Sequence, residues 1–259
     1  MRRVLLVALL LAGGCATAYT TPGRGASMQM FGETQQSSRN MTDGGIQSIL
    51  DKKPLASFPA SVALVRVQAP GYRSHTASGI GGGAFTVVPT RDVEADSDVA
   101  KLAQLPMLRG VAPLNRLVLP NAFQSDFDLR QAAAKMRADM VLIYTLDTQF
   151  VDLNRSTPLT VLTLGVTTTK NKRILTTASA VLMDTRSGYV YGLAEGTHRF
   201  EARQNAWKTE DEVDQDRRKV ESLAFGELVT NLETTWKGVV AEYASPARAS
   251  GGTRYQTEE

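Results

Sequence analysis

The stretch Asp139-Met-Val-Leu-Ile-Tyr-Thr-Leu146 decides the fold, because its side chains are almost continuously apolar. A strand with one face in water alternates apolar and polar residues, whereas a strand that is covered on both faces reads as a continuous apolar run. The stretch therefore predicts a central strand with other elements packed on both sides of its sheet.

A helix is expected directly before this strand. Ser125 and Asp128 have the three-residue spacing of a capping box, and the helix that they open runs to about Arg137. Further upstream, apolar runs bounded by prolines predict strands, and a helical spacing of apolar residues predicts one more helix. These elements are the strands 61–68, 84–88 and 114–119 and the helix 93–105.

Downstream of the central strand the pattern predicts strands over 159–166, 174–183 and 189–200. Asp184-Thr-Arg-Ser-Gly188 joins the last two as a hairpin turn, in which the Asp184 side chain stabilises the turn. A second capping box, Thr209 with Glu212, opens a long helix from about Asp211 to Tyr243. The predicted fold class is α+β (α/β): a single mixed β-sheet with helices packed on it, and a C-terminal β-hairpin followed by a long amphipathic helix.

The N-terminus has the pattern of a lipoprotein signal peptide over residues 1–14. Arg2 and Arg3 precede an apolar run that is too short to span a bilayer, and Gly13 and Gly14 stand directly before Cys15. Cys15 is the one cysteine of the chain, so it has no internal disulfide partner. The pattern predicts cleavage before Cys15 and lipidation of that cysteine; the alternative is a plain secretory signal that happens to contain a cysteine.

The predicted organisation follows from composition. Residues 15–43 form a lipidated, flexible tether rich in Ser, Thr, Gln and Gly, residues 44–244 form a globular α/β domain, and residues 245–259 form a disordered tail. Because Ala16 rather than Asp follows the cysteine, the sorting pattern of enteric bacteria indicates the outer membrane, with the domain facing the periplasm.

The charge balance excludes one class of partner. The chain has 29 Lys and Arg against 26 Asp and Glu, and loss of Arg2 and Arg3 leaves a net charge of about +1. The sequence has no stripe of basic residues interleaved with aromatic ones, which nucleic-acid binding requires. We therefore expect no nucleic-acid partner.

Two motifs resemble those of the CsgG- and LpoB-type periplasmic lipoproteins. One is the helix 129–136 leading into Arg137-Ala-Asp-Met-Val-Leu-Ile143, and the other is the strand from Ala178 that ends in Asp184-Thr-Arg-Ser-Gly188. The resemblance covers about residues 60–200, although Met140 and Ser187 depart from the usual tyrosine and threonine. It implies assembly or activation of partners by contact, since one such relative builds a secretion pore and another activates a wall synthase.

Catalytic or cofactor-binding patterns are not recognisable in the sequence. His75 and His198 lack the spacing of a metal site, and the loop Gly79-Ile-Gly-Gly-Gly83 lacks the Gly-Lys-Ser/Thr ending of a phosphate loop, which favours a flexible connection. We interpret Asp128 as a cap rather than as a metal ligand paired with Asp126. The sequence thus predicts no enzyme, no cofactor and no metal.

Two functional hypotheses remain. The first is a non-enzymatic accessory or assembly lipoprotein that binds an envelope protein or copies of itself; the alternative is a cell-envelope hydrolase with an unrecognised active site. For the first hypothesis, Phe225 and Trp236 are the candidate contact residues, because they lie beside the apolar stripe of the long helix and aromatic residues often anchor interfaces.

Overall fold

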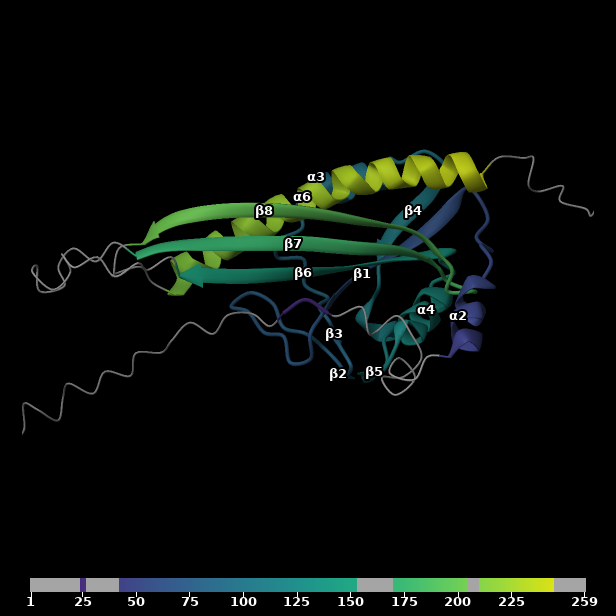
Figure 1. Cartoon of the computed structure of the whole chain (residues 1–259), viewed down its shortest axis with the longest axis horizontal. Coiled ribbons are helices and arrows are strands. Elements are labelled where there is room, and N and C mark those ends of the chain that lie inside the picture. The colour runs from purple at the N-terminus through teal and green to yellow at the C-terminus, as the bar shows by residue number, and fades with distance from the viewer. Residues whose placement is uncertain (1–23, 27–41, 153–169, 205–209, 245–259) are drawn as a thin grey trace, which may run out of the picture.

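The computed structural model describes residues 24–26, 42–152, 170–204 and 210–244 (Figure 1). The helices are α2 (Asp43–Leu50), α3 (Asp96–Ala103), α4 (Asp126–Lys135) and α6 (Glu210–Tyr243), and a short 3₁₀ turn covers Arg116–Val118. None of the helices within these described ranges combines the length and the apolar character that a bilayer-spanning segment needs.

The strands form one mixed sheet and one small ribbon. They are β1 (Ala60–Gln68), β2 (Gly82–Gly83), β3 (Thr86–Val87), β4 (Leu108–Pro113), β5 (Ala122–Phe123), β6 (Met140–Asp152), β7 (Lys170–Asp184) and β8 (Val190–Gln204). The six-stranded sheet has the order β3-β1-β6-β7-β8, and β4 also pairs with β1. β1 is parallel to β4 and β6, whereas β6, β7 and β8 are antiparallel to one another. β2 and β5 form the separate two-stranded ribbon.

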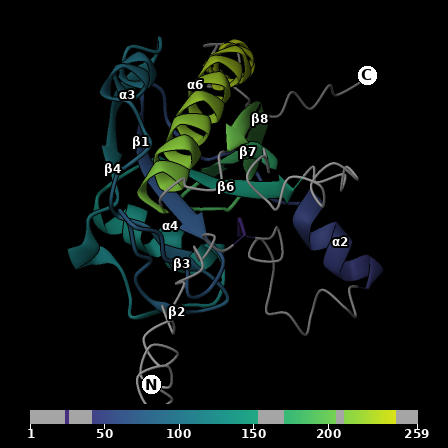
Figure 2. The same ribbon diagram turned by 90° about the vertical axis from the view of Figure 1, so that its left-hand side faces the viewer.

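The sheet carries a hydrophobic core on each face. Figure 2 shows α6 and α4 as separate helices beside the sheet. On the α6 face, inward side chains of the strands pack against α6 and α3; they include Leu64, Leu142 and Leu182. On the α4 face, the alternate residues pack against α4 and the 80–88 region; they include Val141 and Ile143. Two covered faces are the reason that the first half of β6, from Met140 to Leu146, is almost continuously apolar.

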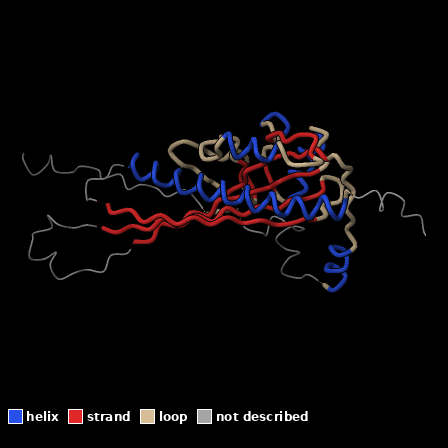
Figure 3. Tube along the Cα trace, turned by 90° about the horizontal axis from the view of Figure 1, so that it is seen from above, coloured by secondary structure: helices blue, strands red, loops and turns tan. Residues whose placement is uncertain are grey.

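Helix α6 crosses the edge strand β8 at very short range, and Figure 3 shows it running along the strands. A Cβ atom at Gly196 would lie 2.3 Å from the Leu228 backbone nitrogen and 2.6 Å from the Ala224 carbonyl oxygen. Asn231 Nδ2 donates a hydrogen bond to the Glu195 carbonyl oxygen at 2.6 Å. The glycine therefore allows the helix backbone to contact the strand directly.

Several sequence-based predictions are confirmed. The mixed sheet, the C-terminal hairpin and the long final helix are present, so the α+β class is correct. The apolar stretch from Asp139 is the start of β6, which continues to Asp152. The capping box is also present: the Ser125 side chain accepts from the Phe127 amide, and the Asp128 carboxylate accepts from the Ser125 amide.

The region between α3 and α4 differs from its prediction. The expected strand 114–119 is wrong: β4 lies earlier, at Leu108–Pro113, and Asn115 instead caps the 3₁₀ turn by accepting from the Leu117 amide. The expected strand 84–88 is reduced to the two residues of β3. The expected strand 159–166, and Thr209 of the second capping box, lie outside the described residues.

Two short elements lie in or beside the expected tether. Arg24–Ala26 contacts the sheet, with a β-bridge between Gly25 and Gln68. α2 begins at Asp43 with Thr42 as its cap, and none of its residues is buried. The expected signal peptide and Cys15 lie outside the described residues.

Candidate binding groove

The two aromatic residues expected to contact a partner are core residues, so that prediction is wrong. The side chains of Phe225 and Trp236 are only 1% and 4% exposed. Phe225 packs against Tyr144 with ring centroids 5.2 Å apart, and the Trp236 indole nitrogen donates to the Pro106 carbonyl oxygen at 2.7 Å. α6 buries a wider arc than its aliphatic stripe because α3 and the chain after it cover its flank.

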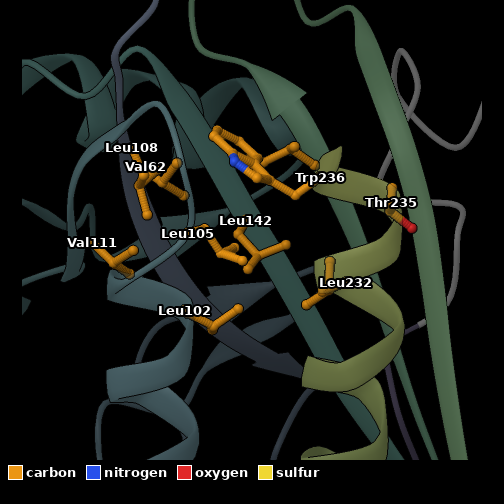
Figure 4. A pocket seen from close by; sticks show the side chains of 10 residues that line it. Val62, Leu102, Leu105, Leu108, Val111, Leu142, Leu232, Thr235 and Trp236 are labelled. Carbon is orange, nitrogen blue, oxygen red and sulfur yellow. The ribbon is translucent and has the colours of Figure 1, made fainter. Parts of the chain in front are cut away.

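An apolar hollow lies beside Trp236 (Figure 4). Its free volume is about 20 Å³, and its lining comes from α3, α6 and the strands: Val62, Leu102, Leu105, Leu108, Val111, Leu142, Leu182, Leu232, Thr235 and Trp236. The volume suffices for about one water molecule, but a water needs two or more polar partners and the walls are almost entirely apolar. We assign the hollow to imperfect core packing rather than to substrate binding.

A cluster of charged side chains is buried where α6 meets β1. Arg66 of β1 pairs with Asp92 at 2.8 Å and donates to the Tyr72 hydroxyl at 2.9 Å. Arg217 of α6 pairs with Asp214 at 2.9 Å and with Glu221. Arg217 also lies 3.5 Å from Asp92, which joins the two halves of the cluster.

Burial and charge act in opposite directions on the acids of this cluster. Burial raises the pKa of Asp92, but the Arg66 guanidinium and the Thr76 hydroxyl outweigh it and hold that pKa below its usual value. Burial of Glu221 prevails over Arg217 and Arg66, so its pKa lies above the usual value. Perturbed pKa values can mark active sites. Here the side chains face one another and are almost fully enclosed, so the cluster joins α6 to β1.

The histidines and the glycine-rich loop are separate from this cluster. The His75 Nδ1 atom lies 3.8 Å from an Asp211 carboxylate oxygen at the start of α6, whereas His198 lies in β8. Within the described ranges no group of three or more His, Cys, Asp and Glu residues is arranged to hold a metal ion. The loop 79–83 packs against β5, where Gly83 approaches the Phe123 backbone too closely for a Cβ atom.

A second hollow lies on the other face of the sheet, the face that carries α4. This binding groove has a free volume of about 440 Å³, within the range of small-molecule and side-chain pockets. Its lining comes from β1, β6, β7 and β8: Val67, Ile143, Tyr144, Thr145, Ser179, Ala180, Val181, Leu193, Ala194 and Glu195. The floor is therefore rigid strand rather than loop.

The groove has an apolar margin and one charged group. Leu193 is 56% exposed, although it is a large apolar side chain, and Val190 nearby on β8 is 43% exposed. Glu195 accepts a hydrogen bond from the Ser179 hydroxyl at 2.9 Å and has no basic partner among the lining residues. Such a surface suits an apolar group that is accompanied by a positive charge.

The β7–β8 turn fixes the end of the groove strands. Asp184 Oδ1 accepts from the Arg186 amide at 2.8 Å and the Ser187 amide at 3.1 Å, which confirms its predicted role in the turn. Its Oδ2 accepts from the Leu55 amide at 2.6 Å and the Tyr191 hydroxyl at 2.8 Å. Burial raises the pKa of this carboxyl, but these hydrogen bonds outweigh burial and hold the pKa below its usual value.

Sequence analysis did not find the groove, although one signal was available. Val190 and Leu193 are apolar, yet the residues opposite them in β7, Met183 and Val181, lie on the α4 face rather than the α6 face. These two side chains stay exposed beyond α4, and the extent of α4 is known only from the structure.

Comparison with known proteins identifies no family. No protein-family model matches the chain, and no curated protein matches it by sequence. Lipoprotein GNA1162 from Neisseria meningitidis is 14% identical over 61% of this chain and 94% of that chain, with a TM-score of 0.28. The hypothetical protein CT253 from Chlamydia trachomatis is 11% identical over 70% of this chain and 98% of that chain, with a TM-score of 0.31. Neither similarity is close enough to carry a functional argument, and the resemblance to CsgG- and LpoB-type proteins stays a prediction.

Proposed function

We propose that this chain is a bacterial envelope lipoprotein that acts without catalysis, by binding another envelope protein through the groove on β6–β8. The anchor is lipid on Cys15, and the domain faces the periplasm from the outer membrane. The proposal of a lipid anchor rests on the basic start of the chain, the short apolar run and the Gly13-Gly14-Cys15 motif that follows it. More than one lipid chain is needed for stable anchoring, which lipidation of an N-terminal cysteine supplies.

The binding function rests on one observation: an apolar groove of about 440 Å³ lies open on a rigid sheet, with Leu193 exposed at its margin. Large exposed apolar side chains beside a hollow are typical of interaction sites. The strands under the groove are held in register by their ladders and by the Asp184 turn. The surface is therefore preformed, and little conformational entropy is lost from the groove when a partner binds.

The chemistry of the lining indicates the kind of partner. The groove favours apolar side chains, and the carboxylate of Glu195 favours a Lys or Arg side chain next to them. The partner is thus a segment of another envelope protein, or of a second copy, that presents apolar residues with a basic one.

The test replaces Leu193 by Asp in the full chain, followed by crosslinking in whole envelopes and thermal unfolding. We expect loss of the crosslinked species with an almost unchanged melting temperature, because the side chain is exposed. Leu223→Asp is the matched control: Leu223 is 44% exposed, but it lies on α6 away from the groove. If Leu193→Asp leaves every crosslink intact, or if both variants abolish them equally, the groove is not the contact.

A further inference from the structure

The chain between the proposed lipid anchor and the domain makes a specific contact with the sheet. The Arg24 carbonyl oxygen accepts from the Ala69 amide at 3.1 Å, and Gly25 forms a β-bridge with Gln68. The Ala26 amide donates to Thr145 Oγ1 at 2.8 Å. We call Arg24–Ala26, in this position, the N-terminal clip.

The clip lies where the backbone pairing between β1 and β6 has ended. β1 and β6 pair from Val62 with Met140 to Arg66 with Tyr144, and the pairing ends there. Beyond this point Gln68 of β1 and Thr145 of β6 are joined through their side chains, since Thr145 Oγ1 donates to Gln68 Oε1 at 3.0 Å. The clip contacts both residues and so closes the gap between the two strands.

The close approach of the clip favours a small residue at position 25. A Cβ atom at Gly25 would lie 3.0 Å from Thr145 Oγ1, 3.3 Å from Asp147 Cβ and 3.4 Å from the Leu146 carbonyl oxygen. Three contacts at this range leave no room for the further carbon atoms of a β-branched side chain. The site therefore selects the small residue that the sequence supplies.

We propose that the clip sets the distance between the domain and the membrane. This inference rests on the proposed lipid anchor at Cys15. With the clip docked, positions 15 to 24 separate the lipid from the first contact with the sheet, and a chain of that length spans at most roughly 30 Å at about 3.3–3.6 Å per residue. With the clip released, positions 15 to 42 separate the lipid from the start of α2, and a chain of that length spans at most roughly 90 Å. A docked clip keeps the binding groove close to the bilayer, and release extends its reach about threefold.

The clip and the groove also share a residue. Thr145 accepts the Ala26 amide and lines the groove. The docking site of the clip and the proposed partner site are therefore adjacent on β6. A docked clip thus limits the distance between the groove and the membrane.

Docking is tested first without the membrane, on the full chain carrying Cys15→Ser, by trypsin cleavage of the Arg24–Gly25 bond followed by mass spectrometry. A protease needs its target backbone free, so docking protects the bond. We expect Gly25→Val to accelerate cleavage about tenfold, the effect of losing one to two net hydrogen bonds, and to speed exchange of the Ala69 amide. Gly110→Val is the control, because a Cβ atom there meets no heavy atom within 4 Å. Equal cleavage and exchange rates in the wild type and in Gly25→Val would refute docking of the clip.

The distance is tested on the lipidated full chain in vesicles of phosphatidylethanolamine and phosphatidylglycerol. A fluorophore attached through Leu223→Cys, on the exposed side of α6, reports energy transfer to labelled headgroups. We expect stronger transfer with Gly25 present than with Gly25→Val. Equal transfer in two membrane-bound proteins refutes the role of the clip in spacing. If neither protein takes up lipid or binds vesicles, the lipid anchor fails and the role in spacing fails with it, whereas the trypsin result still decides whether the clip docks.

Discussion

Replacement of Leu142 by Ala tests the assignment of β6 as the central strand. Leu142 is buried on the α6 face, pairs with Leu64 of β1 and Leu182 of β7, and lines the apolar hollow beside Trp236. Its neighbours belong to three paired strands and a packed helix, so they cannot move far into the space that the smaller side chain leaves.

The magnitude follows from two contributions. Loss of three buried carbon atoms costs about 2.4 kcal/mol at about 0.8 kcal/mol per methylene. The remaining cavity, which joins the existing hollow, brings the total to about 3–4 kcal/mol. Since a domain has only about 5–15 kcal/mol of net stability, this is a large fraction of it.

The assay is equilibrium unfolding in urea, where the midpoint should fall and the slope should stay constant. Leu142→Met conserves volume and should cost less than about 1.5 kcal/mol. Leu223→Ala, at an exposed position of α6, should change stability by less than about 0.5 kcal/mol. A loss below 1 kcal/mol for Leu142→Ala would refute the central position of the strand.

Four further predictions follow. Gly196→Ala should displace α6 and lower the melting temperature, whereas an unchanged value would contradict the close helix–strand contact. Arg217→Met should lower the free energy of unfolding in urea by about 1.5–3 kcal/mol, because Asp214 and Glu221 lose a charge-assisted hydrogen bond while Arg218 and Arg66 remain beside them. The lowered pKa of Asp184 means that the unfolded state binds its proton more tightly; its contribution is therefore present above the usual aspartate pKa and is lost as pH falls through the folded value. The acid-unfolding curve of Asp184→Asn should lack that part of the pH dependence. Cys15→Ser should abolish incorporation of labelled palmitate, and retained label in the membrane fraction would disprove the anchor.

Short-range signals predicted much of the fold. The continuous apolar run of β6, the Ser125 capping box and the Asp184 turn each depend on residues within a few positions of one another, so the sequence alone displays them. β4 could not be found in this way. Its residues Leu-Arg-Gly-Val-Ala-Pro have weak strand propensity, and the strand exists because Leu108 to Pro113 pair with β1 across a long separation in sequence.

The charged cluster, the position of Trp236 and the groove were even harder to predict, because they depend on packing between elements far apart in the sequence. Arg66 of β1 and Glu221 of α6 lie far apart in the sequence, and their cluster appears only once β1 and α6 are placed together. Trp236 looked marginal because the stripe defined one face of α6, whereas Pro106 and Phe58 cover a second. The groove exists because α4 is short relative to the sheet.

The crossing of α6 over β8 affects how crowded copies of this protein behave. An edge strand offers unpaired backbone groups to any other strand that approaches it. On β8, Asn231 and Thr235 already donate to the Glu195 and Leu193 carbonyl oxygens, so an incoming strand must displace a folded helix before it can pair there. Proteins anchored on one surface meet one another often. Under the proposed anchoring, the helix along the edge of the sheet keeps colliding copies from joining their sheets at this position.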